Sequence, residues 1–198
     1  DSRVFDPRAG RLVDRIRQRA GVTIRPIDIR RFAEEVDRVK VIYNGAWAPN
    51  WGFVPMDEAE FRHLGNELKQ IIDPRIVLFA EVDGRPVGFS LALPDINQAL
   101  IHLHGRLFPF GLFKLLWLTK VRKVCTRIRV LVMGILPEYQ KRGIDTVLNY
   151  ETDVRGRAAG YREAEMSWVL ENNDEMNAVA KNLGYQRYKT YRIYEMAL

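Results

Sequence analysis

The chain has 198 residues, of which 47% are hydrophobic, and this is enough to build one sizeable core. Its 31 lysine and arginine residues exceed its 25 acidic residues by a net charge of +6. This excess suits an anionic small ligand and falls short of the clustered charge of a dedicated nucleic-acid-binding protein. A single cysteine, Cys125, excludes an intramolecular disulfide and is typical of a reducing cytoplasm. We therefore expect a cytoplasmic protein without a nucleic-acid partner.

No linker-like stretch divides the chain, which predicts a single domain over residues 1–198 with its core in residues 22–198. The chain begins with "DSRVFDPRAG", which has neither an initiator methionine nor a signal-peptide pattern. We therefore expect a fragment of a longer protein, with an N-terminal domain or a second copy in a homodimer as its protein partner.

The first half of the chain predicts a strand, two helices and a hairpin. Residues 22–29 alternate as a short strand does, and a helix follows from residue 32 to residue 43. The segment "NGAWAPNWGFVP" is typical of a loop, after which Asp57 predicts the cap of a second helix. Two strand-like runs then meet at Asp83 and Gly84, a favoured hairpin turn because glycine adopts positive φ without penalty.

The second half predicts a strand in "RIRVLVMGIL", a helix over residues 145–159, a strand in "EAEMSWVL", a short helix ending at Gly184, and a closing strand in "YQRYKTYRIYEM". The helix over 145–159 is expected to bury Val147 and Val154. The complete order is β-α-α-β-β-β-α-β-α-β. It predicts an α/β (α+β) fold with a mixed sheet and helices on both faces.

An apolar stretch, "LFPFGLFKLLWL" at residues 107–118, is too short to span a bilayer as a helix. It has basic neighbours at Arg106, Lys120, Arg122 and Lys123. Three interpretations are open: peripheral contact with an anionic membrane, cover for an acyl chain longer than acetyl, or a helix packed on the sheet or on a missing N-terminal part.

The segment "LPEYQKRGID" at residues 136–145 joins the predicted central strand to a helix. Gly143 allows a tight turn, and the N–H groups of a helix start converge on one point, which suits a phosphate. Asp145 is discordant, because a carboxylate about 4 Å from a phosphate costs about 1 to 4 kcal/mol. Asp145 could instead turn inward as the helix cap. The alternative is an ordinary connection whose bases are solvated.

The order of elements, together with "GILPEYQKRGID" and "ENNDEMNAVAKNLGY", resembles the GNAT superfamily of acyl-CoA N-acyltransferases over residues 22–198. The family's loop pattern, Gln or Arg, two residues, Gly, one residue, then Gly or Ala, is matched from Gln140 to Ile144 and broken at Asp145. More narrowly, "YNGAWAPNWGFVP" and "YKTYRIYE" resemble a bacterial branch of longer proteins. The resemblance implies a mostly antiparallel sheet and acetyl-CoA or another acyl-CoA as donor, bound by Met133, Ile135, Gln140, Lys141, Arg142, Gly143, Ile144, Asp145 and Asn173.

The resemblance also implies a reaction in which an amine attacks the thioester while a backbone N–H near Ile135 stabilises the oxyanion. The tyrosine that usually serves as the acid is replaced by Ala180. Glu171 and Tyr191 are the substitute catalytic candidates, although packing in a strand is the alternative for Tyr188, Tyr191 and Tyr194. For Asn173, contact with pantetheine and a helix cap are both open.

The acceptor side is predicted from an aromatic loop between the first two helices. In the family this loop overhangs the acceptor cleft, and aromatic walls with a few amides suit a small amine with an apolar part. Aromatic packing under the loop is the alternative. The candidate substrate residues are Tyr43, Asn44, Trp47, Asn50 and Trp51.

Three functions follow. The first is an N-acyltransferase that moves an acetyl or other acyl group from acyl-CoA to a primary amine of a small molecule or amino acid. The second is a non-catalytic GNAT-like module that binds a ligand or scaffolds a partner. The third is a membrane-associated transferase of a longer acyl chain. We expect no metal, because His102 and His104 lack a third ligand nearby in the sequence.

Overall fold

The structure is a computed structural model that describes residues 7–48, 53–106, 108–182, 184–192, 194 and 196. The chain divides into two compact units, Asp1–Ser167 and Trp168–Leu198. The first unit holds the sheet and most of the helices. The second holds one helix, α7 (Asp174–Asn182).

A five-stranded mixed sheet organises the first unit, with the strands in the order β1-β2-β3-β4-β5. Neighbouring strands from β1 to β4 are antiparallel, and β5 runs parallel to β4. The predicted mixed and mostly antiparallel sheet is therefore confirmed. The strands are β1 (Val22–Pro26), β2 (Val77–Val82), β3 (Arg85–Pro94), β4 (Arg127–Ile135) and β5 (Glu163–Met166).

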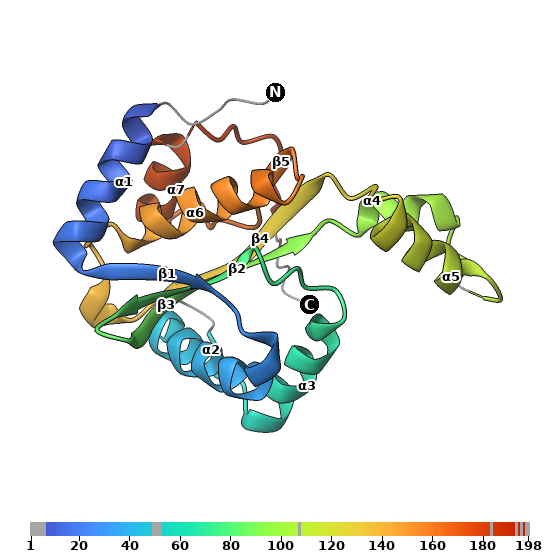
Figure 1. The fold of residues 1–198 in the computed structure, drawn as a ribbon, viewed down its shortest axis with the longest axis horizontal. Coiled ribbons are helices and arrows are strands. Elements are labelled where there is room, and N and C mark those ends of the chain that lie inside the picture. The colour runs from blue at the N-terminus through green and yellow to red at the C-terminus, as the bar shows by residue number, and fades with distance from the viewer. Residues whose placement is uncertain are drawn as a thin grey trace. The chain divides into compact units, whose positions relative to one another are not determined.

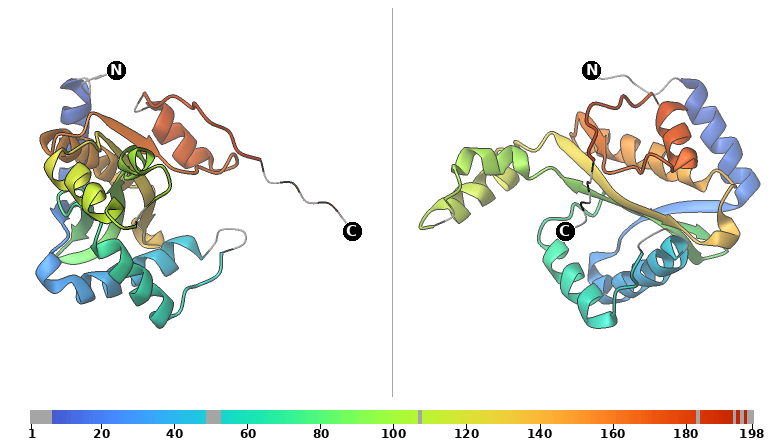
Figure 2. Two further views of the ribbon diagram at one scale, coloured as in Figure 1. Left: turned by 90° about the vertical axis from the view of Figure 1, so that its right-hand side faces the viewer. Right: turned by 180° about the vertical axis from the view of Figure 1, so that it is seen from behind.

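Helices cover both faces of the sheet, as predicted (Figures 1 and 2). On one face lie α1 (Pro7–Ala20) and α6 (Ile144–Ala158), and on the other lie α2 (Phe32–Trp47) and α3 (Glu58–Lys69). Short 3-10 helices, η1 (Ile29–Arg31) and η4 (Pro137–Tyr139), precede α2 and α6. The core is split by the sheet accordingly: Phe79 and Phe89 pack towards α2, whereas Leu78 and Val87 pack towards α6.

Local chemistry explains where these elements begin and turn. Asp83 and Gly84 both have positive φ, 51° and 75°, as a two-residue type I′ hairpin turn requires. Asp57 and Glu60 form a capping box at the start of α3, in which each side chain accepts a hydrogen bond from the other residue's backbone N–H. The predicted hairpin and the predicted cap are both confirmed.

Between β3 and β4 the chain forms a helical extension, called here the arm (residues 97–123). It contains α4 (Asn97–Leu100), η2 (Ile101–Leu103), α5 (Gly111–Leu116) and a π-helical turn, η3 (Trp117–Val121). The arm continues beyond one end of the sheet in Figure 1 and in the right-hand view of Figure 2. The interpretation of residues 107–118 as a helix packed on the sheet is therefore wrong, and most of their apolar side chains are exposed.

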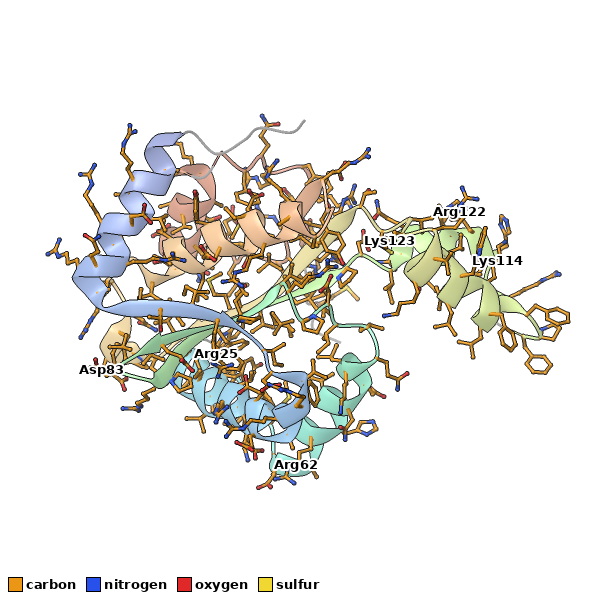
Figure 3. The ribbon with its side chains drawn as sticks, viewed as in Figure 1. Arg25, Arg62, Asp83, Lys114, Arg122 and Lys123 are labelled. Atoms are coloured by element: carbon orange, nitrogen blue, oxygen red, sulfur yellow. The ribbon has the colours of Figure 1, made fainter. Side chains whose placement is uncertain are left out.

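A buried carboxylate ties β1, β2 and α2 together. Glu35 in α2 is 1% exposed and accepts hydrogen bonds from the guanidinium groups of Arg25 in β1 and Arg38 in α2. Arg25, which Figure 3 labels, also donates to Glu81 in β2 at 2.7 Å, and its guanidinium lies 4.6 Å from the centre of the Phe79 ring. Burial is the largest single influence and lowers the pKa of Arg25. The hydrogen bonds and negative charges of the two carboxylates together outweigh it, so that the pKa is raised above its usual value.

Several predicted elements are wrong in detail. No element before residue 22 was expected, yet α1 is present and buries Val13. The predicted strand in "EAEMSWVL" ends at Met166, and Trp168 and Leu170 are exposed. Residues 185–192 are not a strand. Tyr188, Tyr191 and Tyr194 are exposed rather than buried, and Val154 is exposed on α6.

Replacing Glu35 with alanine should lower the free energy of unfolding by about 2 to 3 kcal/mol, because it leaves Arg25 and Arg38 partly buried without their shared carboxylate. Glu34 is the matched control: it also pairs with Arg38 but is 54% exposed. Glu34→Ala should cost less than about 1 kcal/mol. Urea unfolding of both variants measures the difference. If both variants lose the same free energy of unfolding, the buried ion pairs of Glu35 contribute no more stability than the exposed pair of Glu34.

Candidate functional site

The candidate site forms where β4 loses its partner on one side. β5 pairs with β4 only from Arg127 to Val130, and the Ser167 N–H donates to the Val130 carbonyl (3.0 Å) at the end of this pairing. β3 pairs with β4 as far as Ile135. The second half of β4 therefore has one paired edge and one edge that β5 has left.

A β-bulge in β4 decides which groups face that open edge. Leu91 lies opposite Val132 and Ala92 opposite Val130, so that Leu131 is an extra residue. After the bulge, the Leu136 N–H donates to the Val87 carbonyl (2.9 Å), towards β3. Because backbone groups alternate between the two edges of a strand, the N–H groups of Met133 and Ile135 point towards the open edge. This is the direction required of the predicted oxyanion donor at Ile135.

Two side chains hydrogen-bond carbonyls on the open edge. The Trp47 indole donates to the Met133 carbonyl (3.3 Å), and the Gln140 amide donates to the Ile135 carbonyl (3.0 Å). With these acceptors occupied, the edge presents mainly N–H donors to an extended ligand. Such an edge can bind a ligand as an added strand does.

Helix α2 packs unusually close to this part of β4. A Cβ on Gly134 would lie 3.0 Å from Cε1 of Phe89 and 3.3 Å from Cβ of Ala46, and one on Gly45 would lie 3.0 Å from Cδ2 of Leu136. Two glycines therefore bring α2 against β4. This close approach is what allows Trp47 to reach the Met133 carbonyl.

The predicted acceptor residues lie on this helix rather than in a loop. Tyr43 lies in α2, in agreement with the helix predicted to end there. Asn44 and Trp47 were placed in the loop but also belong to α2, because the helix continues to Trp47. Tyr43 stacks on Trp47 with ring centres 5.5 Å apart and also contacts Phe53. Burial raises the pKa of the Tyr43 hydroxyl, which keeps it protonated at neutral pH. Asn50 and Trp51 lie outside the described residues.

Asn44 and Asn149 carry amide oxygens that face no hydrogen-bond donor within the described part of the chain. Asn149 is buried in α6, and its Nδ2 lies 3.8 Å from the sulfur of Met133. Buried acceptors without a donor are costly, so these two oxygens are suited to accept from a ligand N–H.

The turn between β4 and α6 has the shape of an anion site. Lys141 and Gly143 both adopt positive φ, 60° and 79°, and Gly143 is the N-cap of α6 without a side-chain cap hydrogen bond. The first N–H groups of a helix have no partner within the helix, and Gly143 has no side chain to cap them. Lys141 and Arg142 are exposed beside them. Arg142 lies 5.0 Å from the Tyr139 ring and donates to the Glu138 carbonyl (2.8 Å).

Asp145 is not the helix cap, because Gly143 holds that position. It is half-buried in the first turn of α6, and its backbone carbonyl accepts from the Asn149 amide at 3.0 Å. A carboxylate there interacts favourably with the helix dipole. The same charge competes with a phosphate for the helix N-terminus.

Sequence reasoning missed the contribution of α1. A Cβ on Gly143 would lie 3.0 Å from Cγ2 of Ile16, so that α1 packs directly against the turn. Arg17 and Glu151 join α1 to α6 through an ion pair at 2.5 Å. The apolar spacing of Val13, Ile16 and Ala20 was the available signal. Position 143 therefore favours glycine for two reasons: its φ is positive, and the side chain of Ile16 leaves no room for a Cβ.

Three predicted site residues belong to the second unit. Glu171 is exposed and pairs with Arg192 at 2.7 Å, and the Tyr191 ring lies 6.4 Å from the Trp168 ring. The Asn173 side chain accepts from the Met176 N–H at 3.0 Å, which bears out the helix-cap interpretation. The catalytic roles of Glu171 and Tyr191 stay predictions.

A solved structure of the aminoglycoside N-acetyltransferase AAC(6′)-Iy, bound to a bisubstrate analogue of CoA, superposes on this chain with a TM-score of 0.57. The match covers 89% of this chain and 99% of the other at 16% sequence identity. The chain has the GNAT fold. The expected resemblance is thereby confirmed for the architecture.

Two curated proteins are similar to this GNAT-fold chain in sequence. A "bacterial ceramide synthase" of Caulobacter vibrioides is 43% identical over 183 residues, which are 90% of this chain and 47% of that protein. "Protein YghO" of Escherichia coli is 42% identical over 195 residues, 96% of this chain and 49% of that protein. The chain spans about half the length of these relatives. No protein-family model matches it.

Within the described residues, no group of three or more histidine, cysteine, aspartate or glutamate side chains could hold a metal ion. His102 and His104 lie in η2 and directly after it, not on one face of a strand. No helix among those residues is long and apolar enough to cross a membrane.

Replacing Gly143 with alanine should destabilise the GNAT fold by about 2 kcal/mol, because the positive φ costs about 1 kcal/mol and the new Cβ meets Ile16. Gly160→Ala is the matched control: it has a φ of 97° with no atom within 4 Å of the added Cβ, and should show the conformational cost alone. The double variant Gly143→Ala/Ile16→Ala should be about 1 kcal/mol more stable than the sum of the two single losses predicts, because the smaller side chain leaves room for the new Cβ. Zero coupling by urea unfolding would rule out a tight contact between α1 and the turn.

Proposed function

We propose that this chain is the acyl-transfer domain of an N-acyltransferase, which moves an acyl group from acyl-CoA to a primary amine. The observation that carries the proposal is the open edge of β4 leading directly into the N-terminus of α6, where the cap residue is a glycine, in a GNAT fold. Neighbours of this fold that are solved with CoA or a CoA analogue support the same donor. The non-catalytic module is the alternative that the experiments below exclude or favour.

The residues present fit such a donor. Its pyrophosphate would lie at the turn from Gln140 to Asp145, held by the first N–H groups of α6 and by Lys141 and Arg142. The extended pantetheine chain of the donor would lie along the open edge, where the N–H groups of Met133 and Ile135 point. Asn149 supplies a buried acceptor beside Met133.

In the proposed reaction the amine nitrogen attacks the thioester carbonyl carbon, the C–N bond forms, and the C–S bond breaks. The Ile135 N–H would stabilise the carbonyl oxygen as it gains charge. The nitrogen must lose a proton and the sulfur must gain one. Glu171 or, alternatively, Tyr191 stays the proposed acid that protonates the sulfur.

The acceptor would bind against α2. Tyr43 and Trp47 form an aromatic wall on the side of β4 that leads to the open edge, and the Asn44 amide oxygen can accept from an ammonium or amine N–H. Asn50 and Trp51 stay proposed acceptor-binding residues. The protonated Tyr43 hydroxyl would orient the amine rather than deprotonate it.

We further propose that the acceptor is a long-chain amine and that the acyl group is longer than acetyl. A ceramide is the amide of a fatty acyl group and a long-chain amino alcohol, and the relative bearing that name is 43% identical over 90% of this chain. An aromatic wall and the exposed apolar side chains of the arm suit such substrates better than a hydrophilic amine.

Activity tests this choice directly. Purified protein with palmitoyl-CoA and sphinganine should yield the amide by mass spectrometry, at a rate at least about tenfold above that with acetyl-CoA and a hydrophilic amine such as neamine. The Trp47→Ala variant should lower the rate with the long-chain amine more than it lowers the affinity for acyl-CoA. A preference for the hydrophilic pair would overturn the long-chain assignment. No product from either pair, with acyl-CoA bound, would favour the non-catalytic module.

Binding tests the donor site separately. The double variant Lys141→Gln/Arg142→Gln should weaken CoA affinity about tenfold in calorimetry, because two charged donors are lost while the main-chain N–H groups remain. Asp145→Asn should act in the opposite direction, because it removes a negative charge next to the phosphates. The matched control, Arg30→Gln/Arg62→Gln, changes two exposed arginines on η1 and α3 and should leave the affinity unchanged. Equal affinities for all variants would place the phosphates elsewhere.

A further inference from the structure

The arm presents apolar side chains that its own packing does not bury. Phe108 is 90% exposed and Phe110 is 75% exposed, and both precede α5. Along α5 and η3, Phe113, Trp117 and Val121 recur at helical spacing and are also exposed. One face of the arm is therefore apolar and open to solvent. An apolar surface of this size on a soluble domain usually marks an interaction site.

The arm is nevertheless held firmly at its base. Leu103 and Leu118 are buried within it. The Gln98 side-chain carbonyl accepts from the N–H groups of Thr126 (2.9 Å) and Arg127 (3.1 Å), where β4 begins. The Val124 N–H donates to the Leu118 carbonyl at 3.1 Å. The exposed apolar face therefore belongs to an ordered element fixed to the sheet.

The charge of this segment has a single sign. From residue 96 to residue 137 the chain contains no aspartate or glutamate. Five basic side chains in the arm are exposed, and Figure 3 shows three of them, Lys114, Arg122 and Lys123, on the arm. The Arg122 guanidinium lies 5.2 Å from the Trp117 ring, so that cation and aromatic ring share one surface. The five are Arg106, Lys114, Lys120, Arg122 and Lys123.

This combination matches the surface of an anionic bilayer. Aromatic and aliphatic side chains enter the interface between headgroups and acyl chains, while lysine and arginine contact lipid phosphates. Lysine is depleted in protein–protein interfaces, whereas three of the five basic side chains here are lysines. The arm also projects beyond the sheet, which lets its tip reach a flat surface (Figure 2).

We propose that the arm docks this protein on an anionic lipid bilayer, with Phe108, Phe110, Phe113 and Trp117 in the interface and the five basic side chains against lipid phosphates. No helix in the described part of the chain can cross a bilayer, so the contact is peripheral. The inference goes beyond the proposed transfer reaction, and vesicle binding needs no acyl-CoA. The two can therefore fail independently.

Vesicle sedimentation tests the proposal with the 198-residue chain in the absence of CoA. The protein should sediment with vesicles that contain phosphatidylglycerol and remain in the supernatant with pure phosphatidylcholine vesicles. Binding should weaken as salt is raised, because the basic contacts are screened. Brominated lipids should quench the tryptophan fluorescence, and Trp117→Phe should abolish most of that quenching while leaving binding nearly unchanged.

Two variants separate the apolar from the basic contribution. Phe110→Ser/Phe113→Ser should abolish measurable binding, and Lys120→Gln/Lys123→Gln should weaken it roughly 25-fold, about fivefold for each basic side chain. The matched controls Val54→Ser and Arg62→Gln change an exposed apolar and an exposed basic residue outside the arm and should bind as the parent chain does. Circular dichroism melts check that every variant is folded.

Either of two results would overturn the proposal. One is a parent chain that stays in the supernatant with anionic vesicles. If light scattering then shows a dimer that the arm variants do not form, the arm contacts a second copy of the chain and not a bilayer. The other is vesicle binding that persists unchanged in both arm variants, which would move the lipid contact to another surface.

Discussion

The unequal pairing of β4 is the constraint on which the candidate site depends. β3 accompanies β4 to Ile135, whereas β5 leaves it after Val130. The bulge at Leu131 then rotates the strand so that Met133 and Ile135 direct their N–H groups to the edge without a strand. A fully paired β4 would use those donors within the sheet and would offer nothing to an extended ligand.

Segments distant in the chain complete what β4 begins. Helix α2 reaches the open edge because Gly45 and Gly134 permit close packing, and this brings Trp47 onto the Met133 carbonyl. On the opposite face, α1 supports the turn before α6 through Ile16 and Gly143. The turn and the edge are thus held from both faces of the sheet. A site held in this way needs little rearrangement on binding, which lowers the entropic cost of association.

The proposed donor site and the proposed bilayer contact lie along a single strand. The arm connects β3 to the start of β4, and the open edge and the anion turn follow at its end. A transferase of long-chain amines faces substrates that partition into membranes. A bilayer contact at one end of β4 and a donor site at the other would therefore bring a lipid-borne acceptor and a water-soluble donor to the same element.

The sequence by itself determined the Asp83-Gly84 hairpin, the Asp57 cap and the turn at Gly143, because each depends on local spacing or on the φ preference of one residue. It could not show that Asn44 and Trp47 continue the helix, that Ile16 packs on Gly143, or that residues 108–118 stand away from the sheet. It also predicted a closing strand where the structure has none in residues 185–192. An aromatic, β-prone sequence becomes a strand only if a neighbouring strand accepts its hydrogen bonds, and apolar residues are buried only if another element covers them. Those partners are chosen by tertiary structure, through contacts between residues far apart in the chain.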